Sequence, residues 1–386
     1  MRYLRSIVAC AVALSACTAA AFGGDIFRRP DGTFTPAIKG SSPSQADHDA
    51  STYQVANADT EKVTYAIKVG DRLVTQSEPS TRIAEIILEP RKYPPEWKQC
   101  LQAFEGGDYK NAYAGFSEIG AAEKVNPVVR QKALLNAARA AREGGKADEA
   151  EKAYGALLKA FPNSFYSAAA LQEQSQMYMD AGVEDKARKF AEALLKLPGV
   201  SDGDKLQARF LQVTVDFRNA VAKKDQAGIQ KALDAYKALA TETAGKKDFM
   251  AVNQLARIGQ GNCLLELGTP AGASEAKGIF QEIADRAQDK PVCASAFNGL
   301  GDCLFREGNF AEARRCFLRT ATIYTEGTPG DQVARALYYA GECFSKLQDS
   351  PDWKDRAKQE FSECVRRFPK SAWAEKADRG RRALPK

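Results

Sequence analysis

One stretch decides the fold: residues 297–317, which read FNGLGDCLFREGNFAEARRCF. Its second half places Ala313 four positions before Phe317, so both side chains lie on one face of a helix, one turn apart. Gly308 and Asn309 interrupt the apolar pattern just before that helix, as a turn does. The stretch therefore predicts two helices joined by a short turn.

The same pairing of a small residue with an aromatic residue recurs along the chain. It occurs at Ala112/Phe116, Ala150/Tyr154, Ala232/Tyr236, Ala276/Phe280, Ala313/Phe317 and Ala357/Phe361, with a degenerate copy at Ala187, where Phe190 stands one position early. The alanines are separated by 37 to 45 residues. A small residue lets two helices approach and an aromatic ring fills the gap beside it, so this spacing is typical of stacked helix pairs.

Several copies resemble the tetratricopeptide repeat. The best are residues 297–317, residues 337–369 with about four extra residues at the turn, residues 145–162, and the hairpin that begins at Gly107, whereas the third and fourth copies are poorer. The resemblance covers residues 95–370. It implies a mainly α fold, an α-α superhelix of about seven tetratricopeptide-like helix hairpins.

The N-terminus has the pattern of an export signal. Arg2 and Arg5 precede the apolar run 7–14, and small residues follow, so we assign residues 1–23 to a signal segment. Residues 14–17, LSAC, also fit a lipobox, in which Cys17 is lipidated. Cleavage near Ala21 or Gly23 is the alternative, and both stay open. We expect export to the periplasm or cell envelope, with an outer-membrane lipid anchor if Cys17 is acylated.

Residues 24–89 predict a small β-rich module. Its β-branched and aromatic runs are 25–28, 33–39, 52–55, 63–69, 72–76 and 84–88, with turn signals at residues 31–32 and 70–71. Such short strands suit a barrel-like or curled sheet, and they resemble small β modules that precede repeat arrays in some exported bacterial proteins. A proline-rich linker follows at 90–96, then the array at 97–370 and a basic capping helix or tail at 371–386.

Composition argues against several classes of function. The net charge of +6 comes mostly from the leader and from the basic stretch after residue 369, so no broad cationic face is available for nucleic acid. His48 is the only histidine, and neither a Cys-x-x-Cys motif nor a phosphate-binding glycine loop occurs. We therefore expect no cofactor, no metal and no enzymatic activity. An envelope enzyme that acts on cell-wall glycan through paired carboxylates is the alternative from another class.

The cysteines point to buried thiols, not to a disulfide framework. Of the nine, Cys10 and Cys17 belong to the leader, which leaves an odd number. Cys263, Cys303 and Cys343 recur at an interval of 40 residues, so they should lie one repeat apart, too far for a disulfide. Cys303 and Cys316 lie on the two helices of one predicted hairpin and are the pair with the best chance of bonding.

Tetratricopeptide arrays usually bind peptide segments or helices along the face made by the first helix of each pair, so the resemblance implies a protein partner in that groove. The corresponding groove positions are Lys132, Asn136, Arg139 and Arg142 in the second copy, Asn298, Asp302, Phe305 and Arg306 in the sixth, and Arg335, Tyr338, Glu342 and Lys346 in the seventh. Their charges are mixed in sign. We expect a non-catalytic interaction scaffold of the cell envelope, or alternatively an envelope assembly lipoprotein anchored through Cys17.

Overall fold

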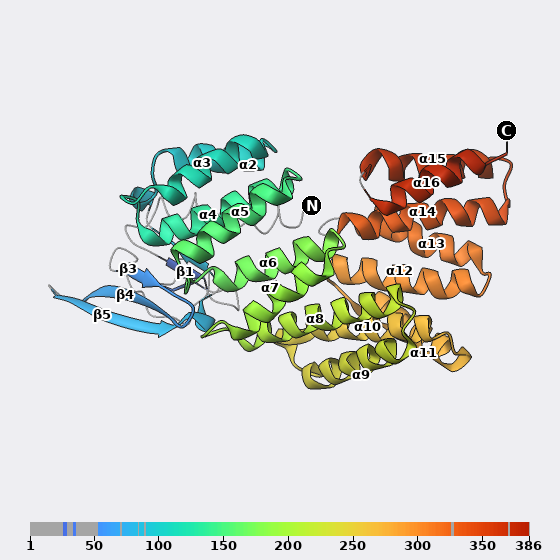
Figure 1. Ribbon diagram of the computed structural model, residues 1–386, viewed down its shortest axis with the longest axis horizontal. Helices are drawn as coiled ribbons and strands as arrows, with labels where there is room; N and C mark the ends of the chain where they lie inside the picture. Colours follow the sequence, from blue (N-terminus) through green and yellow to red (C-terminus); the bar gives the residue numbers. More distant parts are fainter. Residues whose placement is uncertain are drawn as a thin grey trace. The chain divides into compact units, whose positions relative to one another are not determined.

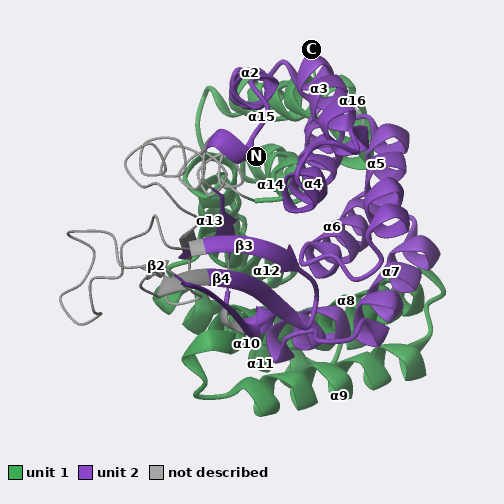
Figure 2. Ribbon diagram, turned by 90° about the vertical axis from the view of Figure 1, so that its left-hand side faces the viewer, with its two compact units in different colours: residues 1–4, 210–386 green, residues 5–209 purple. Residues whose placement is uncertain are grey.

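A computed structural model describes residues 26–28, 34–35, 53–69, 72–83, 85–88, 90–325, 328–369 and 371–385 (Figure 1). The signal segment, the lipidation candidate Cys17 and His48 lie outside these residues. The described chain forms two compact units (Figure 2). Unit 2 holds the described residues up to Arg209, and unit 1 holds those from Phe210 onward. The division falls inside helix α8, Asp202–Ala222.

Antiparallel helix hairpins account for most of both units. Unit 2 contains α2 (Glu96–Glu105), α3 (Tyr109–Ala121), α4 (Pro127–Glu143), α5 (Ala147–Ala160), α6 (Ser167–Asp180) and α7 (Glu184–Lys196). Unit 1 contains α9 (Gln226–Thr243), α10 (Met250–Leu267), α11 (Pro270–Arg286), α12 (Lys290–Arg306), α13 (Phe310–Thr322), α14 (Gly330–Leu347), α15 (Trp353–Arg367) and α16 (Ala372–Ala383). With α8 pairing with α9, the described residues form seven hairpins, which confirms the predicted fold class.

Each hairpin turns through one residue with a left-handed backbone. Glycine fills this position at Gly107, Gly145, Gly182, Gly268 and Gly308, with φ between 69° and 83°. Glycine adopts this conformation without steric penalty because it has no Cβ. The fourth and seventh hairpins use Lys224 and Gln348 instead, with φ of 54° and 48°. These are the two hairpins in which the sequence shows no glycine between the helices.

The recurring aromatic rings fit against glycines of the first helices. A Cβ built on Gly261 would lie 2.6 Å from the Phe280 ring, and one built on Gly299 would lie 2.5 Å from the same ring. Gly261 belongs to the hairpin of Phe280 and Gly299 to the next hairpin, so one ring is clamped between two successive repeats. Phe280 is fully buried. Because Gly261 and Gly299 have no side chain, both first helices can approach the Phe280 ring, and this contact sets the spacing between the two repeats.

Helix α16 takes the place of a further first helix at the end of the array. A Cβ on Gly341 of α14 would lie 2.6 Å from the Phe361 ring, and one on Gly380 of α16 would lie 2.9 Å from it. Phe361 is therefore clamped between α14 and α16 as Phe280 is between α10 and α12. Its position gives α16 the packing role of a cap over the last hairpin.

The degenerate third copy packs differently. Ala187 is fully buried on α7, and Ala191 fills the position of the missing ring and is equally buried. Phe190 is only half-buried, and its ring stacks on Tyr178 with centroids 5.7 Å apart. The aromatic contact is made from the neighbouring position 190, which explains why the alanine–aromatic pairing is irregular in this copy.

The described residues of the N-terminal module form two antiparallel sheets of three strands each. One has the order β2-β1-β6, with β1 at Ile26–Arg28, β2 at Phe34–Thr35 and β6 at Glu85–Ile87. The other has the order β3-β4-β5, with β3 at Tyr53–Ala58, β4 at Lys62–Val69 and β5 at Arg72–Pro79. The Phe27 and Tyr65 rings meet edge to face at 5.0 Å and join the two sheets.

The module lies against the second and third hairpins of unit 2. The Thr60 backbone N–H donates to the Asn163 carbonyl at 2.9 Å, and Asp59 forms a β-bridge with Ser164. The predicted proline-rich linker contains a short 3-10 helix at Pro90–Lys92. The backbone contacts and the burial of Phe27 make the module an integral part of unit 2.

All seven cysteines of the described chain are buried free thiols, Cys303 and Cys316 included. Burial raises the pKa of Cys263, Cys303 and Cys343 to about 12. A thiol with such a pKa is almost entirely protonated at neutral pH and is a poor nucleophile. These side chains act as small apolar residues between helices.

Candidate functional site

The twelve groove positions fall into two sets, one in each unit. Lys132, Asn136, Arg139 and Arg142 lie on α4 in unit 2, and the other eight lie on α12 and α14 in unit 1. The first helices α12 and α14 contact each other. The groove side chains of α4 instead form ion pairs with residues of α6 and of the β module.

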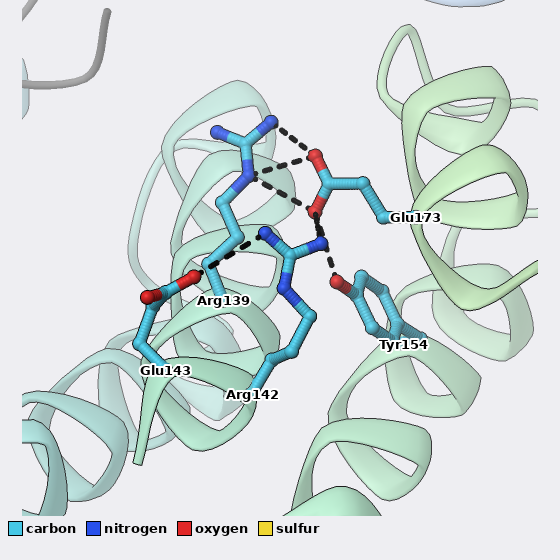
Figure 3. Close-up of polar contacts among 5 residues, drawn as sticks. All are labelled: Arg139, Arg142, Glu143, Tyr154 and Glu173. Atoms are coloured by element: carbon cyan, nitrogen blue, oxygen red, sulfur yellow. Dashed lines mark hydrogen bonds and ion pairs between the residues drawn. The ribbon is translucent and has the colours of Figure 1, made fainter. Parts of the chain in front are cut away.

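In unit 2 the arginines of α4 form an ion network with the next repeat (Figure 3). The Arg139 guanidinium donates to both carboxylate oxygens of Glu173 on α6, at 2.6 Å to Oε1 and 3.2 Å to Oε2. The Tyr154 hydroxyl donates to Oε2 at 2.8 Å. Arg142 lies 3.6 Å from Glu173 and 3.6 Å from Glu143. Glu173 therefore joins α4, α5 and α6.

The electrostatics of this network favour the charged forms of Glu173, Arg139 and Arg142. Burial opposes ionisation of Glu173, but Arg139 and Arg142 outweigh it and hold the pKa of that carboxyl below its ordinary value. Burial and the adjacent Glu173 carboxylate raise the pKa of Tyr154, which stays a neutral hydrogen-bond donor. The charges are paired with each other, so they bind the repeats together.

The rest of the α4 set is also engaged inside unit 2. Lys132 pairs with Glu85 of the β module at 3.3 Å, and both side chains are largely buried. Burial lowers the pKa of Lys132, but Tyr93 and Glu85 outweigh it and raise the pKa overall. Asn136 is buried. The sequence marked these α4 positions but not their partners Glu85 and Glu173, because helical spacing does not show which neighbouring element faces a side chain.

In unit 1, four of the eight groove positions bind neighbouring repeats. Arg335 of α14 donates to both oxygens of Asp302 on α12, each at 2.5 Å. Burial raises the pKa of the Asp302 carboxyl, and Arg335 only partly offsets it. Arg306 donates to the Leu265 carbonyl at 2.5 Å and to Glu266 at 2.7 Å. The Asn298 amide donates to the Gln332 carbonyl at 3.2 Å, while its buried oxygen has no hydrogen-bond partner within the described residues.

The other four positions lie among aromatic rings. We call Phe305, Phe310, Tyr338, Tyr339 and Trp373, together with the cations Arg335 and Lys346, the aromatic–cation surface. Their rings form a chain from α13 through α12 and α14 to α16, with centroids 5.1 Å apart for Phe305–Phe310, 5.4 Å for Phe305–Tyr339 and 5.7 Å for Tyr338–Trp373. All five rings are half-buried, so each keeps an exposed part.

Cations lie over this chain of rings. The Arg335 guanidinium is 4.9 Å from the Tyr339 centroid, and the Lys346 ammonium is 5.9 Å from that of Phe305. Lys346 is exposed. Glu342 lies between Tyr338 and Lys346 in sequence on α14; burial raises the pKa of its carboxyl, and Lys346 opposes the shift. The surface thus offers apolar rings, one exposed cation and one half-buried carboxyl.

Sequence reasoning missed three members of this surface. Tyr339 follows the predicted Tyr338 directly, Phe310 opens α13, and Trp373 lies on the capping helix α16. Little in the sequence pointed to Trp373, because the capping helix was recognised by its basic residues and not by an alanine–aromatic pair. Within the described residues, no group of three or more His, Cys, Asp and Glu side chains could hold a metal ion. Nor is any described helix long and apolar enough to cross a membrane.

Comparisons with known proteins agree with this architecture. A family model described as tetratricopeptide repeat matches residues 292–352, and a second with the same description matches residues 132–164 and 335–371. A search of curated proteins gave no match.

Similar solved structures include three proteins of low identity. A tetratricopeptide repeat protein from Parabacteroides merdae is 17% identical, with a TM-score of 0.49, over 75% of this chain and 99% of that one. PilW, a type IV pilus biogenesis factor, is 15% identical, with a TM-score of 0.39, over 64% and 96%. A Rap protein complexed with competence and sporulation factor is 14% identical, with a TM-score of 0.41, over 74% and 94%. The chain therefore contains tetratricopeptide repeats at residues 132–164 and 292–371, within an array of helix hairpins of the same architecture.

Proposed function

We propose that the protein is a non-catalytic interaction scaffold that binds a segment of a partner protein across α12 and α14. The observation that carries this proposal is the aromatic–cation surface of unit 1. Aromatic and arginine side chains are enriched where proteins bind partners, because they bury much area and lose little conformational freedom. Repeat arrays commonly use the faces of successive first helices for this purpose.

In our proposal, the four groove residues of α4 hold neighbouring repeats together and do not bind the partner. The Arg139 guanidinium donates three hydrogen bonds to the Glu173 carboxylate, and Lys132 is paired with Glu85. A partner would have to break these contacts before using either side chain, and a broken buried pair is costly. In unit 1 the exposed Lys346 and the outer parts of Phe305 and Tyr338 need no such rearrangement.

The chemistry of the surface suggests the kind of segment it takes. The rings of Phe305 and Tyr338 favour an apolar or aromatic side chain, and Lys346 favours an acidic side chain beside it. We therefore expect a segment that pairs an apolar anchor with an acidic residue.

Peptide display tests this proposal. The chain from Asp25 serves as immobilised target for a random peptide library, and the affinity of selected peptides is measured by fluorescence anisotropy. Phe305→Ala and Lys346→Glu should each weaken binding about tenfold or more, as the loss of about 1.4 kcal/mol requires. Lys358→Glu, an exposed charge reversal on α15, is the matched control and should bind like the wild type. Equal affinity in all four proteins would rule out this surface.

We also propose that the protein is exported and acts in the periplasm or cell envelope. The signal-like pattern of residues 1–23 supports export. Two mature forms are compatible with it: simple cleavage of the segment, and a lipid anchor at Cys17. Expression of the full chain with Cys17→Ser and mass spectrometry of its N-terminus distinguish the two. An acylated Cys17 in the wild type supports the anchored form, and an N-terminus near Asp25 supports simple cleavage.

A further inference from the structure

Strand β5 leaves one edge of the second sheet open within the described residues. The sheet order is β3-β4-β5, so β3 and β5 are its edges (Figure 1). The β3 edge continues into the array through the Asp59–Ser164 bridge and the Thr60–Asn163 hydrogen bond. β5 pairs only with β4, through eight consecutive residue pairs. No described strand pairs with its other edge, which carries a row of backbone donors and acceptors.

The side chains of β5 are exposed along most of the strand. All but Glu78 are exposed, and Leu73 and Val74 are 62% and 41% exposed. A long, regular edge strand with exposed apolar side chains is unusual, because such edges readily add a further strand. The strand carries no lysine, and its proline stands at the last position. Its charged residues and its proline stand at the two ends, so the central residues 73–77 lack the common devices that block strand addition.

We propose that β5 pairs antiparallel with β5 of a second copy of this chain about a two-fold axis at Thr75. In this register Arg72 faces Glu78 of the partner subunit, and the reverse pair repeats the contact on the other side of the axis. Leu73 faces the partner's Ser77, and Val74 faces the partner's Gln76. The two sheets become one sheet of six strands with an isologous interface.

Charge complementarity selects this register. Shifting the axis to Val74 or Gln76 removes the Arg72–Glu78 pair, and placing it between Thr75 and Gln76 sets Arg72 against Pro79, which has no N–H to donate. Opposite charges that face each other across strands stabilise pairing by about 0.2–1 kcal/mol. Glu78 already has a contact within its own chain, so the partner's Arg72 adds to that contact.

The proposed dimer is independent of the aromatic–cation surface. It uses only β5 in unit 2, whereas partner binding uses α12 and α14 in unit 1. An interface of a single strand is small, so the dimer should be weak and depend on concentration. Its role would be to present two copies of the repeat array to partners, which raises the apparent affinity for any partner with two binding segments.

Disulfide trapping tests the register. Residues that face each other across antiparallel strands have Cα atoms about 4.5–5.5 Å apart, within the range of a disulfide. Thr75→Cys in the chain from Asp25 should therefore give a covalent dimer under mild oxidation, since the described native cysteines are buried. Ser77→Cys is the control, because the two Ser77 positions lie about 13 Å apart along the strands. A monomeric Thr75→Cys protein, or equal cross-linking of both variants, would overturn the proposal.

Charge reversal tests the same pairing without a cross-link. Sedimentation equilibrium should show weaker association for Arg72→Glu and for Glu78→Arg, and association restored when both changes are combined. Lys62→Glu, an exposed charge reversal on β4, should leave association unchanged. Failure of the double variant to recover, or protection from hydrogen exchange in a dilute monomer of those β5 amides that do not bond to β4, would show that the edge is not free for a second copy.

Discussion

At the scale of single residues, glycines in the first helices let aromatic rings pack between successive repeats. The rings of Phe280, Phe317 and Phe361 occupy space beside glycines of the first helices. The sequence predicted the rings and their alanines, all fully buried in the structure, because the four-residue spacing repeats. It did not show that Gly299 contacts the ring of the preceding hairpin, since spacing within one copy carries no information about its neighbour.

Gly299→Ala should destabilise the protein by about 1–2 kcal/mol, because the added methyl group meets the Phe280 ring at 2.5 Å and overpacking outweighs the gain in helix propensity. Gly278→Ala is the matched control on α11, where an added Cβ meets nothing within 4 Å, so it should stabilise by about 0.5–1 kcal/mol. Thermal unfolding followed by circular dichroism compares them. A shift of the same sign in both would contradict the clamped ring.

The left-handed residue Lys224 gives a second prediction at this scale. Lys224→Gly should stabilise the fourth hairpin by about 1 kcal/mol or less, because relief of the left-handed strain exceeds the added entropy of the unfolded chain. Lys223→Gly, at the preceding residue, relieves no such strain and should be neutral or destabilising. Urea unfolding of both variants measures the difference. Equal midpoints would mean that the turn stores no strain.

At the scale of elements, polar contacts join successive helix pairs. Glu173 receives Arg139 and Tyr154 from two helices of the preceding hairpin, and Asp302 receives Arg335 from the next one. The resemblance to tetratricopeptide repeats placed Arg139, Asp302 and Arg335 on the first-helix faces. Their pairing depends on the rotation between neighbouring hairpins, which no local pattern encodes. Several predicted groove residues are therefore contacts between repeats.

Glu173→Gln should destabilise unit 2 by about 1–3 kcal/mol at neutral pH, because it removes the carboxylate that Arg139 binds and leaves Arg142 with Glu143 alone. The folded-state pKa of Glu173 lies below its ordinary value, so the stabilisation is present above the unfolded pKa and is lost as pH falls through the folded pKa. The difference in unfolding temperature between wild type and variant should shrink on acidification. A difference that does not change with pH would show that the charge of Glu173 is not what stabilises the unit.

At the scale of the whole molecule, a β module and a repeat array share one chain that forms two compact units. The sequence predicted the α-helical repeats from their recurring alanine–aromatic pairs, and the strand-rich N-terminus from β-branched and aromatic runs separated by turn signals. It could not predict the unit boundary inside α8, since the helix is continuous in pattern and in structure. Nor could it separate the packing residues of α4 from the ring-lined surface of α12 and α14, because both occupy equivalent repeat positions.

The central claim is that a partner segment lies across the first helices α12 and α14. Hydrogen–deuterium exchange of the chain with and without a selected peptide tests it most directly. The account predicts slower exchange in residues 297–306 and 335–346 on binding, and unchanged exchange in α4 and α6. Protection confined to α13 and α15, or to the β module, would contradict the account.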